Sequence, residues 1–151
     1  MTVKEQTQEH INKVQMFLTM CEIELIARAV NHDKSKLESP EAEVFEIYTA
    51  KLKGVTYGTP EYKQMLAEMK PALDHHYANN RHHPEYHKDG IKGMNLLDLL
   101  EMVCDWKAAT LRHADGDIAK SLELNQKRFG YSDELKEVFR NTVNRIQPDK
   151  I

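Results

Sequence analysis

The stretch Val30-Asn31-His32-Asp33-Lys34-Ser35-Lys36 ends a long apolar helical pattern with an adjacent imidazole and carboxylate, and two lysines follow closely. Hydrophobic spacing upstream of it predicts helices over residues 5–20 and 22–33. These can equally form one continuous helix, because no residue between them clearly interrupts the pattern. Imidazole and carboxylate groups are common ligands of divalent metal ions. The pair is therefore the centre of a predicted metal site, and further ligands are expected elsewhere in the chain.

Upstream of the pair, His10 begins a stripe in which Val14, Phe17 and Cys21 follow at helical spacing. Residues so spaced share one face of a helix, and an apolar face is expected to point to the core. A histidine there serves either as a hydrogen-bonded core residue or as a metal ligand, since neutral imidazole suits both roles. His10 is therefore a candidate metal ligand, and a hydrogen-bonded core residue is the alternative.

Two helix-start signals occur downstream, Ser39-Pro40-Glu41 and Thr59-Pro60-Glu61. Each combines a capping hydroxyl, a proline for the first turn and an acid near the positive end of the helix dipole. The first predicts a helix to about residue 53, followed by a turn over residues 54–58. Pro71 either kinks the second helix or starts a new one that ends near residue 79.

The rest of the chain predicts a loop over residues 80–93 and helices over 95–113, 118–129 and 132–146. No convincing strand or internal repeat is present. The sequence therefore predicts an all-α fold of about seven helices. We expect a single domain over residues 1–151, with a motif-bearing core at about 8–113 and C-terminal helices at about 117–147.

The composition excludes several classes of protein. Its 40% hydrophobic and 30% charged residues are ordinary for a soluble globular chain of 151 residues, and the net charge of −3 implies no general attraction to nucleic acid. Only Cys21 and Cys104 are present, without a CxxC pair, so buried reduced thiols are expected rather than a cysteine zinc site. With no apolar leader core and no membrane-length apolar run, a cytoplasmic protein without membrane contact is expected.

Histidine is the unusual component, because five of the eight histidines fall between His75 and His87. His76 and His83 are seven residues apart, as are His75 and His82, and the first of these two pairs is favoured as additional metal ligands. The alternative is that these are loop histidines, which bond to the backbone or bind a substrate phosphate.

The predicted helix over residues 95–113 carries an acidic face. Asp98, Glu101 and Asp105 are spaced i, i+3, i+7, which places them within about 60° of one another. Burying a carboxylate in an apolar helix is costly without a compensating charge. A metal ion or a buried salt bridge could supply that charge for Asp105.

The ordered set of His10, His32-Asp33 and Asp105 resembles the HD-domain superfamily of metal-dependent phosphohydrolases, which is all-helical and is named for its adjacent His and Asp. The resemblance covers roughly residues 8–113 and implies that these four residues bind the metal. Ser35 stands where many members have glycine. The tract around His75 and His83 is also similar to a small, largely phage-associated group of HD-like proteins.

The resemblance implies a metal-activated water that hydrolyses a phosphate ester of a nucleotide or a similar small molecule. A set of imidazoles and carboxylates suits Mn²⁺, Zn²⁺, Fe²⁺, Co²⁺ or Ni²⁺ better than Mg²⁺. One ion is expected, or two as in some branches that carry extra histidines. The metal would lower the pKa of its water from about 16 to about 7.

Other residues are candidates for work on the substrate. Lys36, Arg81 and His82 are predicted to bind phosphate, although Lys36 could simply be a solvated residue at a helix C-terminus. Glu85, Glu101 or Lys36 are predicted to take part in catalysis. Glu101 could equally hold a ligand histidine in the correct tautomer.

Two other functions compete with hydrolysis. One is a non-catalytic HD-fold module that binds a nucleotide or a partner protein. The other is a di-iron HD-fold oxygenase, which would need both extra histidines on metal. The C-terminal helix could pack within the domain or contribute to a homo-oligomer.

Overall fold

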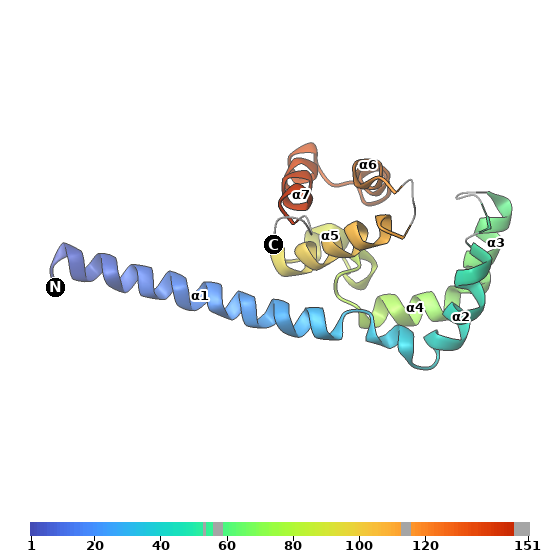
Figure 1. The fold of residues 1–151 in the computed structure, drawn as a ribbon, viewed down its shortest axis with the longest axis horizontal. Helices are drawn as coiled ribbons and strands as arrows, with labels where there is room; N and C mark the ends of the chain where they lie inside the picture. Colours follow the sequence, from blue (N-terminus) through green and yellow to red (C-terminus); the bar gives the residue numbers. More distant parts are fainter. Residues whose placement is uncertain (53, 56–58, 113–115, 147–151) are drawn as a thin grey trace. The chain divides into compact units, whose positions relative to one another are not determined.

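The computed structural model describes residues 1–52, 54–55, 59–112 and 116–146 (Figure 1). It contains seven α-helices and three short 3-10 helices, and no strand occurs in these ranges. The predicted all-α fold of about seven helices is therefore confirmed. The chain divides into two compact units, residues 1–32 and 33–151, and each is described by itself. The prediction of a single domain stays a prediction.

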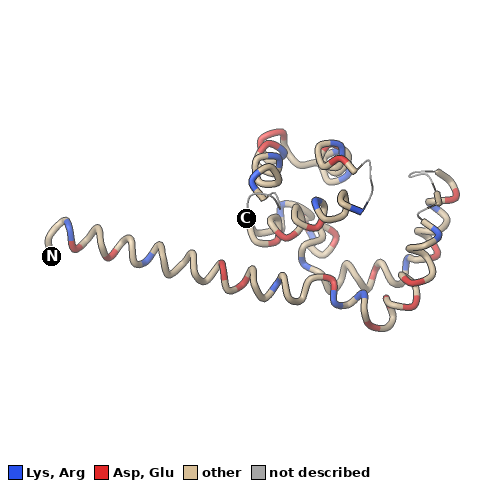
Figure 2. Tube along the Cα trace, in the orientation of Figure 1, with Lys and Arg blue, Asp and Glu red and all other residues tan. Residues whose placement is uncertain are grey.

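The first unit is one helix, α1 (Val3–Asn31), followed by His32 as its C-cap. It begins with a capping box, in which the Thr2 side chain accepts from the backbone of Glu5 and the Glu5 side chain accepts from the backbone of Thr2. Of the two readings of this segment, the structure has the continuous helix. Figure 2 shows that its middle part carries no charged residue, which corresponds to residues 14–21 of the sequence.

None of the residues of α1 is buried, so the prediction that the stripe from His10 to Cys21 faces a core is wrong for this structure. The physical reason is that the unit consists of this helix alone, and no second element within it covers the apolar face. The expected burial of the two cysteines is wrong as well. Cys21 and Cys104 are both free thiols, and both are exposed.

The second unit starts with the 3-10 helix η1 (Lys34–Leu37) and the helices α2 (Glu41–Leu52), α3 (Pro60–Glu68) and α4 (Lys70–Asn79). Thr59 caps α3 as its sequence predicts, because its side chain accepts from the backbone N–H of Tyr62. Pro71 lies in the first turn of α4, where its missing N–H costs nothing, so it starts a new helix. Elements η1, α2 and α4 all contact one another. The turn predicted at 54–58 lies partly outside the described residues.

The predicted loop after α4 contains the 3-10 helices η2 (Pro84–Tyr86) and η3 (Gly90–Gly93). The chain then forms α5 (Leu96–Thr110), α6 (Ile118–Phe129) and α7 (Asp133–Arg145). Each of these starts at a side-chain cap, supplied by Asn95, Asp117 and Ser132 in turn. Gly130 ends α6 in the left-handed conformation (φ 68°), which glycine adopts without strain.

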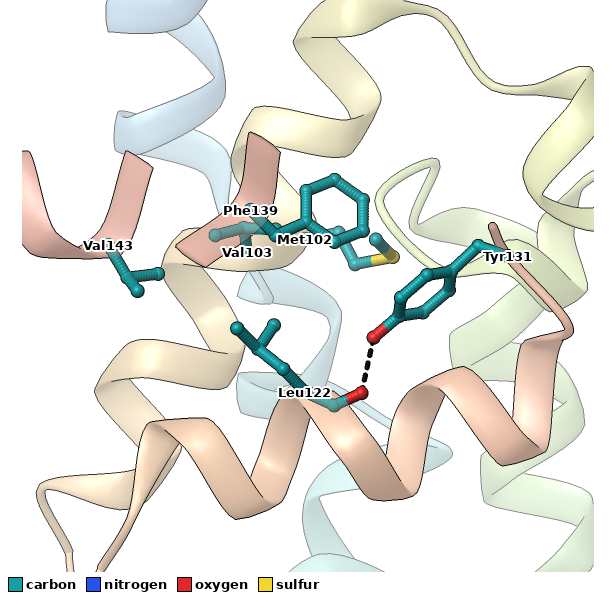
Figure 3. Close-up of a cluster of buried hydrophobic side chains, with 6 residues drawn as sticks. All are labelled: Met102, Val103, Leu122, Tyr131, Phe139 and Val143. Carbon is teal, nitrogen blue, oxygen red and sulfur yellow. Dashed lines mark hydrogen bonds between the residues drawn. The ribbon is translucent and has the colours of Figure 1, made fainter. Parts of the chain in front are cut away.

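The hydrophobic core of the second unit lies between α5, α6 and α7 (Figure 3). The Tyr131 hydroxyl donates to the Leu122 carbonyl at 2.6 Å, which satisfies the one polar group that this tyrosine brings into the core. Trp106 is partly buried and packs against this core, with its ring stacked on that of Phe129. The buried members are Met102, Val103, Leu122, Tyr131, Phe139 and Val143.

Candidate metal centre

Four side chains of the second unit converge where η1 meets α4 and the loop after it. Asp33 directly precedes η1 and adopts a left-handed backbone (φ 54°), which aspartate tolerates better than most residues. His76 lies in the last turn of α4. His82 and His83 sit in a tight turn before η2, closed by the bond from the His83 N–H to the Asn80 carbonyl. Asp33, His76, His82 and His83 are called the His/Asp cluster below.

The ligand atoms of the cluster have the spacing of groups that share one ion. His76 Nε2 lies 2.9 Å from His83 Nε2 and 3.4 Å from Asp33 Oδ1, and His82 Nε2 lies 3.4 Å from the same oxygen. Two atoms bound at zinc-like lengths of about 2.0–2.1 Å, with angles from square to tetrahedral, are about 2.8–3.4 Å apart. All four ligand atoms lie within 4.8 Å of one another. The cluster could therefore hold a metal ion.

The protonation states of the histidines also suit a metal. Burial is the main cause that lowers the pKa of His83 to about 3, and the nearby imidazoles of His82 and His76 contribute to the same shift. Burial lowers the pKa of His76 too, and the positive charge of Lys36 acts in the same direction. Neutral imidazole is the form that binds metal, so these rings do not have to lose a proton first.

Two glutamates hold the outer ring nitrogens. Glu41 Oε2 lies 2.9 Å from His76 Nδ1, and Glu101 Oε1 lies 3.2 Å from His82 Nδ1. In both rings it is Nε2 that lies nearest Asp33. The contact of Glu101 fits the alternative in which it fixes the tautomer of a ligand histidine. Glu41 was not predicted as a site residue, because an acid in the first turn of a helix is ordinary and nothing local marks it as buried.

Lys36 contacts the other oxygen of the aspartate, with Nζ 2.6 Å from Asp33 Oδ2 and 5.4 Å from the centre of the Phe45 ring. Asp33 thus presents Oδ2 to a cation and Oδ1 to the imidazoles. Lys36 lies beside the cluster as expected, but its predicted roles in phosphate binding and catalysis stay predictions.

The three acids of α5 have three different surroundings. Asp105 Oδ2 lies 3.9 Å from His82 Nε2, at the edge of the cluster. Asp98 is fully buried, and Arg81 binds both of its oxygens at 3.1 Å. The salt bridge with Arg81 compensates the buried charge of Asp98. The two alternatives for Asp105, a metal ion or a buried salt bridge, both stay open.

Three other residues predicted to bind phosphate or to take part in catalysis have contacts within the protein. The guanidinium group of Arg81 forms an ion pair with Asp98, and the carboxylate of Glu85 forms one with Arg128 at 2.6 Å. His82 is buried within the cluster, and the predicted phosphate binding by Arg81 and His82 and catalytic role of Glu85 stay predictions. His76 and His83, the two histidines favoured as additional metal ligands, are both in the cluster. Sequence spacing did not single out His82, because the chain leaves the helix before it.

A family model matches residues 1–148, almost the whole chain, and its description reads "Family of unknown function (DUF5662)". The chain belongs to this family. Neither the search of curated proteins nor the search of solved structures found a match. Since the description of DUF5662 gives no activity, the function of this member has to be argued from its site.

Two predicted ligands of this DUF5662 chain, His10 and His32, belong to the first unit. The prediction that they share an ion with Asp33 and Asp105 stays a prediction. Among the described residues of this family member, no helix combines the length and the apolar character of a membrane span.

Proposed function

We propose that the His/Asp cluster binds a divalent transition-metal ion and that the protein is a metal-dependent phosphohydrolase. The observation that carries this proposal is the spacing of the ligand atoms. Asp33 Oδ1 lies 3.4 Å from two imidazole nitrogens, which come from two different segments of the chain. Such contacts between acceptor-rich groups are costly unless a cation or a proton lies among them.

The donor set supports the choice of ion. Three imidazoles and a carboxylate match Zn²⁺, Mn²⁺, Fe²⁺, Co²⁺ or Ni²⁺, whereas Mg²⁺ prefers oxygen ligands and water. An ion held there would act as a Lewis acid and would lower the pKa of a bound water. Asp105, at the edge of the cluster, is placed to accept a proton from such a water or to serve as a further ligand.

The substrate class rests on the resemblance to the HD superfamily. We propose a phosphate ester of a nucleotide or of a similar small molecule. Lys36 contacts Asp33 of the cluster, and a substrate oxygen could compete with Asp33 Oδ2 for its ammonium group. A cation in this position would stabilise the negative charge that develops on phosphate oxygens.

The test is elemental analysis of protein purified without chelator, followed by hydrolysis assays of nucleotides and generic phosphodiesters with added Mn²⁺ or Co²⁺. Asp33→Ala should lose the metal and lower turnover by more than about 100-fold, because it removes a ligand. Asp74→Ala is the matched control, since Asp74 lies exposed on α4, where it pairs with Lys70. It should behave as wild type.

The outcomes separate the two parts of the proposal. Wild-type metal content in Asp33→Ala would reject the His/Asp cluster as the binding site. Metal binding without hydrolysis of any phosphate ester would reject the phosphohydrolase and favour the non-catalytic module.

A further inference from the structure

Glu41 is a fully buried carboxylate with an unusual number of donors around it. Its Oε1 lies 2.7 Å from His75 Nδ1, and its Oε2 lies 2.9 Å from His76 Nδ1. The Ser35 hydroxyl donates to Oε2 at 3.0 Å. A buried acid is rare unless its charge is satisfied, so this arrangement has a cause beyond helix capping.

The protons around His76 can be counted. The amide nitrogen of Asn80 donates to the Ser35 hydroxyl oxygen and to the His76 carbonyl, both at 2.8 Å, which uses both of its hydrogens. The single hydroxyl hydrogen of Ser35 goes to Glu41 Oε2. The Asn80 amide nitrogen also lies 3.1 Å from His76 Nδ1 and the Ser35 hydroxyl oxygen lies 3.4 Å from it, but with their hydrogens directed to these other acceptors neither group donates to Nδ1. The proton in the 2.9 Å contact between His76 and Glu41 therefore belongs to the imidazole, with the carboxylate as acceptor.

A neutral imidazole with its proton on Nδ1 has a lone pair on Nε2. That lone pair faces His83 Nε2 at 2.9 Å and Asp33 Oδ1 at 3.4 Å. The buried pocket of Glu41 thus decides which nitrogen of His76 is available to the cluster. It also fixes the plane of the ring, because the contact holds one edge of it.

We propose that Glu41 is a positioning residue, which accepts the Nδ1 proton of His76 and so keeps its Nε2 ready to bind the metal ion. The inference rests on the proposed metal site and adds to it a residue outside the ligand set. Glu101 stands in the same relation to His82, at 3.2 Å. The case for Glu41 as a positioning residue is stronger, because its side chain is fully buried and its contact with the imidazole is shorter.

The first measurement needs no variant and no metal. A long-range nitrogen–proton NMR correlation spectrum of the metal-free wild-type protein near neutral pH reports which nitrogen of each histidine carries the proton. We expect His76 to carry its proton on Nδ1. A proton on Nε2 of His76 would overturn the proposal.

The second measurement is Co²⁺ affinity, followed by the visible absorption of the bound ion. Glu41→Met keeps an unbranched side chain but removes the acceptor, and it should weaken binding by about 10–100-fold and allow both tautomers of His76. Glu41→Gln keeps one acceptor oxygen, so its loss should be smaller. Glu43→Gln is the control, because Glu43 is exposed in the same first turn of α2 and should leave both readouts unchanged.

Wild-type Co²⁺ affinity in both Glu41 variants would overturn the proposal. If Glu41→Met does not fold, as judged by circular dichroism, the Co²⁺ affinity of Glu41→Gln and the tautomer of His76 in the wild type still test the proposal. Failure of the phosphohydrolase function is a separate result, since neither measurement uses a substrate. Failure of wild-type protein to bind Co²⁺ would reject the metal site, while the tautomer would still be read on metal-free protein.

Discussion

His83 shows how burial can prepare a side chain for metal binding. Its ring lies 4.1 Å from that of His82 and 4.7 Å from that of His76, measured between centroids. A proton on any one of these rings raises the cost of a proton on the others. Burial and this repulsion together keep His83 neutral over the physiological range of pH, with a pKa of about 3.

The lowered pKa of His83 predicts how the stability of the metal-free protein depends on pH. Below the ordinary histidine pKa of 6.5 the unfolded chain binds a proton that the native ring does not, so the free energy of unfolding falls as pH falls. The contribution is fully present above about pH 6.5 and is lost as pH approaches 3. The direction for His76 is the same.

Urea unfolding at a series of pH values in the presence of chelator measures this effect. The stability of the wild type should decrease more steeply with acid than that of His83→Asn, which has no ring to protonate. Equal slopes for the two proteins over this range would contradict the assignment of a neutral, buried His83.

At the scale of elements, α5 connects the core to the site. One side of it contributes Met102 and Val103 to the core with α6 and α7. Its acids lie elsewhere, and Glu101 and Asp105 reach His82. The core therefore sets the position of α5, and α5 sets the position of part of the cluster.

Two leucines of α6 test how far the core determines stability. Leu122 is 0% exposed and Leu124 is 55% exposed, although both are in the same helix. Leu122→Ala should lower the free energy of unfolding by about 2–5 kcal/mol through lost burial and a cavity. Leu124→Ala should change it by no more than about 0.5 kcal/mol. Chemical denaturation of both variants measures the difference, and similar losses would contradict the assigned core.

At the scale of the whole molecule, the cluster joins segments far apart in the chain. Asp33 comes before η1, His76 from α4, and His82 and His83 from the loop after it. The unfolded chain does not hold these side chains together. An ion that binds the cluster is therefore expected to stabilise the native state.

Calorimetry with and without metal tests this coupling. At a free metal concentration of about 100 times Kd the stabilisation should be about 2.7 kcal/mol, which corresponds to a rise in Tm of roughly 5–10 °C. Chelator should reverse the shift, and Asp33→Ala should show none. A shift of the same size in Asp33→Ala would place the metal at another site.

The local elements were predictable because their signals lie within a few residues. Thr59 and Ser132 cap their helices with their own side chains, and Gly130 ends α6 where a left-handed residue is needed. Helical periodicity gave the all-α class for the same reason. Exposure of α1 was not predictable, because a periodic pattern shows which residues share a face but not whether another element covers it.

The sequence by itself determined where the helices lie and that Asp33, His76 and His83 are chemically suited to a metal. Only the tertiary structure decided that His82 joins them, that Glu41 is buried behind His76, and that Arg81 neutralises Asp98. Helix formation depends on neighbours within a turn or two, whereas burial and contact depend on residues brought together from distant positions. Glu41 and His76 are separated by 35 residues, and nothing at either position reveals the other.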